Sequence, residues 1–278
     1  MPTATLDGTT LHYLDEGSGH PAVVLLHAFP LHAGMWERQI DALAERVRVV
    51  APDLVGFGGS DAPEDPSAYS VDGWADDVAR LLDHLGLDRV VVAGQSMGAY
   101  VAFSFLRRHR SRLAGLVLAD TRPTADSAEA RDRRVRQQEQ MSAGGEAGKA
   151  EVVEGLLQTL LCPDTLEHRL DVVETARRLM DNPPHGLVGA LEAMKRRPDS
   201  VGDLATVDVP TLVLVGDQDA PSPPEVAQSM QQGIPGAELV VVPGAGHLSG
   251  LEAPEAFNAA LVDFVSRLQD HGPPSVAR

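Results

Sequence analysis

The sequence has a single cysteine and almost no lysine. Cys162 alone cannot form an intramolecular disulfide or a metal site of several cysteines, and its isolation fits a reducing compartment. No apolar run reaches the length that a membrane span needs. The segment Met1–Gly8 has neither the basic start nor the apolar core of a secretion signal. We therefore expect a cytoplasmic protein that does not enter a membrane.

Positive charge is also in short supply. The formal net charge is -17, and Lys149 and Lys195 are the only lysines. An acidic surface repels a phosphate backbone, which makes nucleic acid an unfavourable partner. With 278 residues, the chain is long enough for one large domain with an inserted subdomain. We expect a monomer or a homodimer that acts on a small molecule.

Short apolar runs alternate with amphipathic segments, which is typical of an α/β fold with a mostly parallel central sheet flanked by helices. The opening stretch predicts an antiparallel hairpin at the sheet edge, formed by Thr3–Leu6 and Thr10–Leu14 around the turn Asp7-Gly8. Helices are predicted over Glu37–Glu45 and Val71–Leu85 and after Met97, Pro224 and Pro254. The predicted buried strands are Ala22–Leu26, Val47–Ala51, Val90–Ala93, Leu113–Ala119, Thr211–Val215 and Glu238–Val242.

This alternation stops between residues 122 and 204, where no strand-like run occurs. Apolar residues there recur at helical spacing, which predicts a helical cap inserted into a core of residues 1–121 and 205–270. Such an insertion can cover the carboxyl edge of the sheet, where ligands bind in open α/β folds. Residues 271–278 contain Pro273-Pro274 and few apolar side chains, so we expect a flexible tail.

The most specific local motif is Gly94-Gln95-Ser96-Met97-Gly98, which lies between a predicted buried strand and a predicted helix. This G-x-S-x-G pattern is typical of a nucleophile elbow, a turn so tight that glycines are needed beside the serine. The serine is held in a strained conformation that exposes its hydroxyl, and the following helix directs its positive N-terminal end to the same point. Ser96 is therefore the candidate nucleophile.

A serine hydroxyl needs a base, and the base needs an acid to orient it. His247 follows the last predicted strand in the glycine-rich segment Pro243–Leu248 and is the candidate base. Asp219, in the loop after the strand Thr211–Val215, is the favoured acid. Asp217, two residues earlier, and Asp120, at the end of another strand, remain alternatives. The order Ser96, Asp219, His247 is the one expected for an α/β-hydrolase.

The negatively charged oxygen of the reaction intermediate needs two hydrogen-bond donors. We assign one to the backbone N–H of Met97, directly after the nucleophile. The second is the backbone N–H of Phe29, in the loop His27-Ala28-Phe29-Pro30 after the strand Ala22–Leu26. His27 is expected to shape this loop by bonding to nearby backbone.

These motifs together resemble the α/β-hydrolase fold superfamily, in the branch of small esterases, enol-lactonases and cofactor-free haloperoxidase-like enzymes. The resemblance extends over residues 3–268 apart from the insertion, and it also rests on Asp53–Ser60 and Gly216–Asp219. It implies the same nucleophile, base, acid and oxyanion donors. Ala28 stands where many relatives have glycine, which reduces the freedom of the loop. The glycine-rich Asp53–Ser60 contains no lysine and predicts a structural turn rather than a phosphate site.

The sequence therefore predicts a serine hydrolase that cleaves carboxylic esters through an acyl-enzyme and needs no metal or organic cofactor. The resemblance leaves lactone hydrolysis, carbon–carbon bond hydrolysis and peracid formation as alternatives, and a non-catalytic binding protein is a more remote one. Haloalkane dehalogenases and epoxide hydrolases resemble the chain less, because they have an aspartate in place of Ser96. Arg122 could pair with a substrate carboxylate or form a surface ion pair. The candidate substrate-pocket residues are Trp36, Arg122, Leu157, Leu161 and Leu248.

Overall fold

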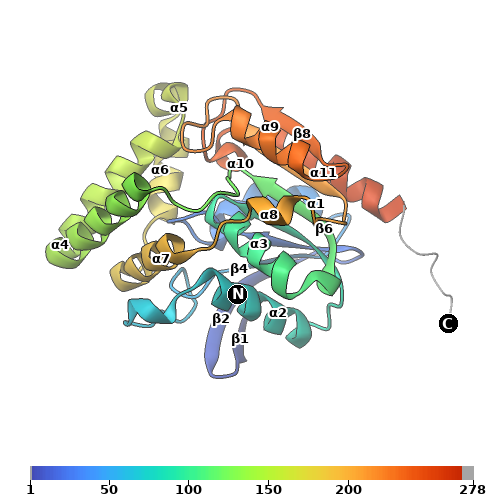
Figure 1. The fold of residues 1–278 in the computed structure, drawn as a ribbon, viewed down its shortest axis with the longest axis horizontal. Helices are drawn as coiled ribbons and strands as arrows, with labels where there is room; N and C mark the ends of the chain where they lie inside the picture. Colours follow the sequence, from blue (N-terminus) through green and yellow to red (C-terminus); the bar gives the residue numbers. More distant parts are fainter. Residues whose placement is uncertain (1, 271–278) are drawn as a thin grey trace.

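A computed structural model describes residues 2–270, and a single twisted sheet runs through the middle of them (Figure 1). The tail expected over residues 271–278 lies outside the described residues. The eight described strands have the spatial order β1-β2-β4-β3-β5-β6-β7-β8. They are β1 (Thr3–Leu6), β2 (Thr9–Glu16), β3 (Ala22–Leu26), β4 (Val49–Pro52), β5 (Val90–Gln95), β6 (Leu113–Ala119), β7 (Thr211–Gly216) and β8 (Glu238–Val242).

Strand direction in this sheet places several loops at one edge. β1 and β2 pair antiparallel as the predicted hairpin, and β2 pairs antiparallel with β4. From β4 to β8 all neighbouring strands are parallel. The carboxyl ends of β3 to β8 therefore point to the same edge, where ligands bind in folds of this kind. The predicted fold class, an α/β fold with a mostly parallel sheet flanked by helices, is confirmed.

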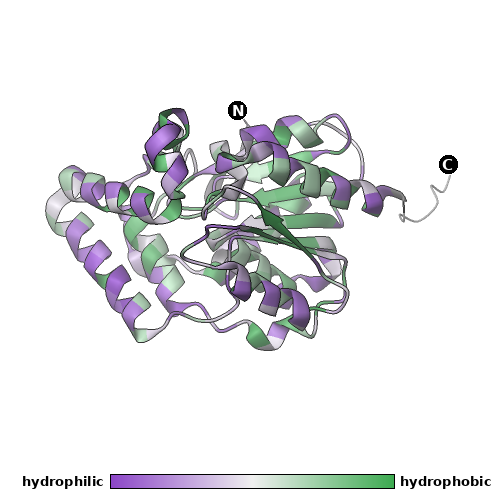
Figure 2. Cartoon of the chain, turned by 90° about the horizontal axis from the view of Figure 1, so that it is seen from above, coloured by the Kyte–Doolittle hydropathy of each residue, from purple (hydrophilic) through white to green (hydrophobic). Residues whose placement is uncertain are grey.

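Helices cover both faces of the sheet because the strands are apolar on both sides. Along β3, Val24 and Leu26 pack into one hydrophobic cluster, and Val23 and Leu25 pack into the other. The strands are accordingly the most uniformly hydrophobic elements in Figure 2. The helices outside the insertion are α1 (Glu37–Leu43), α2 (Val71–His84), α3 (Met97–Arg108), α9 (Pro224–Gly233), α10 (Ser249–Glu252) and α11 (Pro254–Asp270).

Between β6 and β7 the described chain is helical and contains no strand. Its helices are α4 (Ala128–Leu160), α5 (Pro163–His168), α6 (Leu170–Leu179), α7 (Pro184–Arg196) and α8 (Val201–Leu204). α4 is kinked at Gly145, and α4 to α7 form a group at the left of the sheet in Figure 1. No helix within residues 2–270 is both long and apolar enough to cross a membrane.

The predicted strands match the structure most closely where the apolar run is bounded by turn residues. β3, β6 and β8 have the predicted bounds, whereas β4 begins at Val49 instead of Val47. The reason is local, because the N–H of Val47 bonds to the carbonyl of Leu43 and continues the turn after α1. The strand starts at Val49, which has partners in both neighbouring strands.

Candidate active site

Ser96 lies on a sharp turn between β5 and α3. Its φ of 53° is in the left-handed region that side chains rarely adopt, which is the strain expected of a nucleophile elbow. A Cβ atom at Gly94 would lie 2.3 Å from the carbonyl oxygen of Gly98, and one at Gly98 would lie 2.1 Å from that of Leu26. Both positions therefore require glycine, and the second brings the start of α3 against the end of β3.

The turn is also fixed from β6. The N–H of Ser96 donates to the carbonyl of Ala119 at 2.9 Å, and the hydroxyl of Thr121 donates to the carbonyl of Ser96 at 3.1 Å. Ser96 is half-buried, whereas its neighbours Gln95 and Met97 are fully buried. The strained turn thus leaves the serine more accessible than the residues on either side of it.

The structure brings Ser96, His247 and Asp219 together in one chain of hydrogen bonds. His247 Nε2 lies 2.7 Å from Ser96 Oγ, and His247 Nδ1 lies 2.9 Å from both carboxylate oxygens of Asp219. His247 is in the loop between β8 and α10, and Asp219 follows β7. With Nδ1–H donating to the carboxylate, Nε2 is left to accept the proton of the serine hydroxyl.

Opposing effects set the pKa of His247. Burial lowers it, but the charge of Asp219, the hydrogen bond that the ring donates to Asp219 and the charge of Asp120 raise it more. The pKa of His247 therefore lies above its ordinary value, although the charge of Arg122 opposes the rise. A raised pKa makes the imidazole a stronger proton acceptor, which suits a general base.

The two alternative acids occupy different positions. Asp217 is exposed, and its carboxylate accepts the N–H of Ala245 at 3.2 Å. Asp120 is fully buried and accepts the side-chain N–H of Gln95 at 2.6 Å, the hydroxyl of Ser249 and the N–H of Gly216. Burial and the charge of Asp219 raise the pKa of Asp120 to about 8. Neither alternative has a hydrogen bond to the imidazole ring of His247 among the described residues.

Two buried backbone N–H groups have no hydrogen-bond acceptor within residues 2–270. They are the N–H groups of Phe29 and Met97, the pair assigned from the sequence to the oxyanion. Both residues are buried, and a buried backbone N–H without an acceptor is rare in proteins. Their role as oxyanion donors stays a prediction.

His27 bonds to nearby backbone, as the sequence predicts. Its Nδ1 lies 3.1 Å from the carbonyl of Ala28, and its Nε2 accepts the N–H of Leu54 at 3.1 Å. Burial lowers the pKa of His27 to about 4, so the ring is neutral at pH 7. A neutral ring that donates on one side and accepts on the other ties the loop after β3 to the loop after β4.

The apolar pocket candidates share one hydrophobic cluster. Trp36, Leu157, Leu161 and Leu248 are all fully or almost fully buried there. The ring of Trp36 lies 6.1 Å from that of Phe257, centroid to centroid. Arg122 is half-buried three residues after the end of β6. Their role in substrate binding stays a prediction.

Two more buried side chains lie beside the site, and neither was assigned a role from the sequence, although Gln95 is part of the Gly94–Gly98 motif. Glu252 accepts the N–H groups of Gly246 at 2.9 Å and Leu248 at 3.3 Å, on either side of His247, and also that of Cys162 at 2.8 Å. Gln95 donates to the carbonyl of His247 at 2.9 Å. Both hold the histidine loop. Glu252 lies only five residues after His247, and this closeness in sequence could have identified it as a residue of the histidine loop.

Among residues 2–270, no three His, Cys, Asp or Glu side chains are grouped in a way that could hold a metal ion.

Comparisons with known proteins agree with this fold. A family model described as "alpha/beta hydrolase fold" matches residues 21–254. A thermophilic esterase from Thermogutta terrifontis, solved with malate bound, is 39% identical and superposes with a TM-score of 0.90, covering 96% of this chain and 98% of its own. The enol-lactonase from Burkholderia xenovorans LB400 is 28% identical with a TM-score of 0.86, covering 95% and 100%. An AB hydrolase superfamily protein of Bacillus subtilis is 28% identical over 269 residues, covering 94% and 97%.

Proposed function

The chain belongs to the α/β-hydrolase fold family and is a hydrolase, and from this premise we propose that it cleaves carboxylic esters through a serine acyl-enzyme. The observation that carries the proposal is the continuous hydrogen-bonded chain from Ser96 Oγ through His247 to Asp219. The free N–H groups of Phe29 and Met97 support it, because they supply the two donors that an oxyanion needs.

The proposed reaction has two halves. His247 Nε2 takes the hydroxyl proton of Ser96 as Oγ bonds to the acyl carbon, and the oxyanion accepts hydrogen bonds from the N–H groups of Phe29 and Met97. His247 then gives the proton to the departing alkoxide. Water next attacks the acyl-enzyme, His247 takes its proton, and the carboxylic acid leaves as the proton returns to Ser96 Oγ. Asp219 holds the ring and stabilises its charged form throughout.

We propose that the helices between residues 122 and 204 cap this site and that the substrate is small and largely apolar. The apolar cluster of Leu157, Leu161 and Leu248 supports this, because it joins the insertion to the residue directly after His247. The backbone gives further support, since the N–H of His247 donates to the carbonyl of Leu160 at 2.8 Å. Cytoplasmic location and a monomeric or dimeric state are part of the same proposal.

Covalent labelling tests the proposed nucleophile and separates a hydrolase from a binding protein. A fluorophosphonate probe is expected to attach one group to Ser96, located by peptide mass spectrometry. The base must be neutral to activate the serine. Because Asp219 raises the pKa of His247, the labelling rate should fall as the pH decreases through a midpoint above about 6.5. Absence of labelling at every pH, or labelling at another residue, would contradict the proposal.

A lactone that bears a carboxylate is the second candidate substrate, and Arg122 favours it. Arg122 is half-buried, yet its guanidinium has no hydrogen bond or ion pair within the described part of the chain. A partly desolvated guanidinium without a partner is costly, which favours an anionic ligand. The malate bound to the esterase, a dicarboxylate, and the relation to an enol-lactonase support the same candidate. Within the described part of this chain, the other arginines whose side chains have no hydrogen bond or ion pair are all exposed. They are Arg38, Arg46, Arg131, Arg133, Arg136 and Arg178.

Replacing Arg122 tests this second candidate. In Arg122→Ala, kcat/KM for carboxylated lactones should fall by about 10- to 100-fold, the value of a charge-assisted hydrogen bond, while neutral lactones and esters keep theirs. The acid limb of the pH profile should also move upward, because the charge of Arg122 lowers the pKa of His247. Arg131→Ala removes an exposed arginine and is the matched control. Equal losses on charged and neutral lactones would exclude carboxylate recognition.

A further inference from the structure

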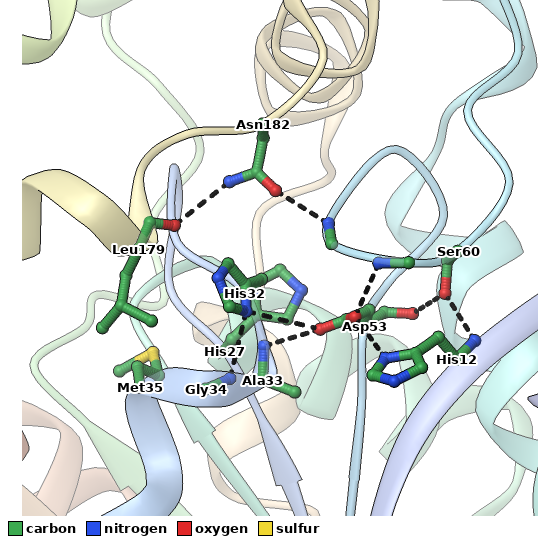
Figure 3. Close-up of polar contacts among 12 residues, drawn as sticks. His12, His27, His32, Ala33, Gly34, Met35, Asp53, Ser60, Leu179 and Asn182 are labelled. Atoms are coloured by element: carbon green, nitrogen blue, oxygen red, sulfur yellow. Dashed lines mark hydrogen bonds and ion pairs between the residues drawn. The ribbon is translucent and has the colours of Figure 1, made fainter. Parts of the chain in front are cut away.

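Asn182 joins the insertion to two loops of the core. It lies three residues after the end of α6, and its side chain is buried with an exposed fraction of 2%. Its Nδ2 donates to the carbonyl of Pro30 at 2.8 Å and to that of Leu179 at 3.2 Å. Its Oδ1 accepts the N–H of Gly58 at 2.7 Å. Figure 3 shows this amide between the end of α6 and the loop that carries Asp53 and Ser60.

Three of the four hydrogen-bonding positions of the Asn182 amide are occupied, including both of its N–H groups. The two Nδ2–H groups face two carbonyls, and Oδ1 faces a backbone N–H, so the partners themselves fix the orientation of the amide. Among these partners, Pro30 belongs to the loop after β3 and Gly58 to the loop after β4. The insertion therefore binds both loops through one buried side chain.

The core side of the same loops is held by Asp53 (Figure 3). This carboxylate has an exposed fraction of 1% and accepts the N–H of Ala33 at 2.7 Å and that of Gly59 at 2.9 Å. Its Oδ2 lies 2.6 Å from Nδ1 of His12. The loop after β3 is thus fixed by Asp53 and His27 from the core, and by Asn182 from the insertion.

The position of the Pro30 carbonyl bears directly on the proposed oxyanion donor. Pro30 follows Phe29, whose N–H is the donor taken from this loop, and the proline ring fixes one of the few dihedral angles between the two groups. Oxyanion stabilisation depends on donors already fixed within about 3 Å of the developing charge. Holding the Pro30 carbonyl therefore restrains the N–H that the reaction uses.

We propose that Asn182 is a positioning residue for catalysis: through Pro30 it sets the place of the Phe29 N–H. This inference rests on the proposed function, because it takes the Phe29 N–H as an oxyanion donor. It also makes the insertion a fixed part of the reaction centre in addition to a cover over it.

Two variants separate positioning from folding. Asn182→Asp keeps the oxygen that faces Gly58 and puts an oxygen where the donor to Pro30 stood, and Asn182→Ala removes all three bonds. Loss of one oxyanion donor costs about 10²- to 10³-fold in rate, so its displacement should lower kcat about 10- to 100-fold in both variants. KM should stay within about threefold, because the ground-state ester uses this N–H less than the transition state does.

The measurement is kcat per active site on a neutral ester, with sites counted by fluorophosphonate titration. Boronic acids that form a tetrahedral adduct on Ser96 should lose affinity in parallel with kcat/KM, which a merely structural role would not cause. Asn258→Ala is the control, since this asparagine also bonds a carbonyl, that of Arg38, but between α1 and α11. It should lower the melting temperature and keep kcat per site.

The outcomes are distinct. The first outcome is that the wild type is active and both Asn182 variants have a kcat per site within about twofold of the wild-type value. This result would overturn the positioning role alone. A wild type that neither labels nor turns over esters or lactones would overturn the proposed function and the positioning role with it. A reduced number of active sites with unchanged kcat per site would assign Asn182 to folding only.

Discussion

Replacing Ser96 with alanine is expected to reduce kcat for short p-nitrophenyl esters by about 10⁶-fold, because the reaction loses the atom that forms the acyl-enzyme. The fold should persist. Alanine meets the same φ of 53° as serine does, and the variant loses one partly exposed hydrogen bond, which is worth about 1 kcal/mol. Ester turnover and the thermal midpoint, measured on the same preparation, test both parts of the prediction.

Ser104→Ala provides the matched control for this loss. Ser104 is on α3, the helix that follows Ser96. It is fully buried and donates to the carboxylate of Asp72 at 2.5 Å, away from the hydrogen-bonded chain of Ser96. Its replacement should lower the thermal midpoint and keep kcat. Retention of more than about 1% of wild-type turnover in Ser96→Ala would show that another group is the nucleophile.

The sequence allowed the core and the order of the proposed catalytic residues to be predicted because their signals are local. An apolar run such as Leu113–Ala119 predicts a buried strand from its own composition. The elbow can be predicted from five consecutive residues. Its glycines are required because a side chain there would clash with the backbone of the same turn or of the adjacent strand. Asp219 and His247 follow strands whose carboxyl ends must share one edge of a parallel sheet, which brings them near Ser96.

Residues whose contacts span the chain gave no such signal. Asn182 bonds Pro30 across 152 positions and Gly58 across 124, and Glu252 bonds Cys162 across 90. Each contact depends on how the insertion sits against the core, which no periodicity in the sequence encodes. The substrate cannot be predicted from the sequence for the same reason, because the candidate pocket residues Leu157 and Leu161 belong to the insertion.

The structure places two buried carboxylates near the imidazole of His247, and their contacts differ. Asp219 bonds to the ring nitrogen, whereas Asp120 reaches the same loop through Gln95, which donates to the carbonyl of His247. We therefore expect Asp219 to orient the ring, because it contacts the imidazole directly. A role in holding the loop belongs to Asp120.

In Asp219→Asn we expect kcat to fall by about 10⁴-fold. The N–H of Ser222 donates to Oδ1 of Asp219 at 2.7 Å and should keep the amide oxygen there, which turns the new NH₂ group toward His247 Nδ1. Nδ1 must then accept, the proton moves to Nε2, and the ring can no longer take the proton of Ser96. Because Asp219 raises the pKa of His247, the remaining activity should persist to lower pH than in the wild type.

Asp120→Asn is the matched comparison, since it makes the same chemical change in the second buried acid. The oxygen that accepts the N–H of Gly216 can remain, but the new NH₂ faces Nε2 of Gln95. The Gln95 amide must therefore turn to present Oε1, and it then loses its bond to the carbonyl of His247. The loss should be about five- to tenfold, the value of one or two rearranged hydrogen bonds. Steady-state kinetics across pH 5 to 9 would distinguish the two acids. A reversed order of losses would assign the imidazole to Asp120, with the hydrogen bonds of Gln95 and Ser249 then reorganised during the reaction.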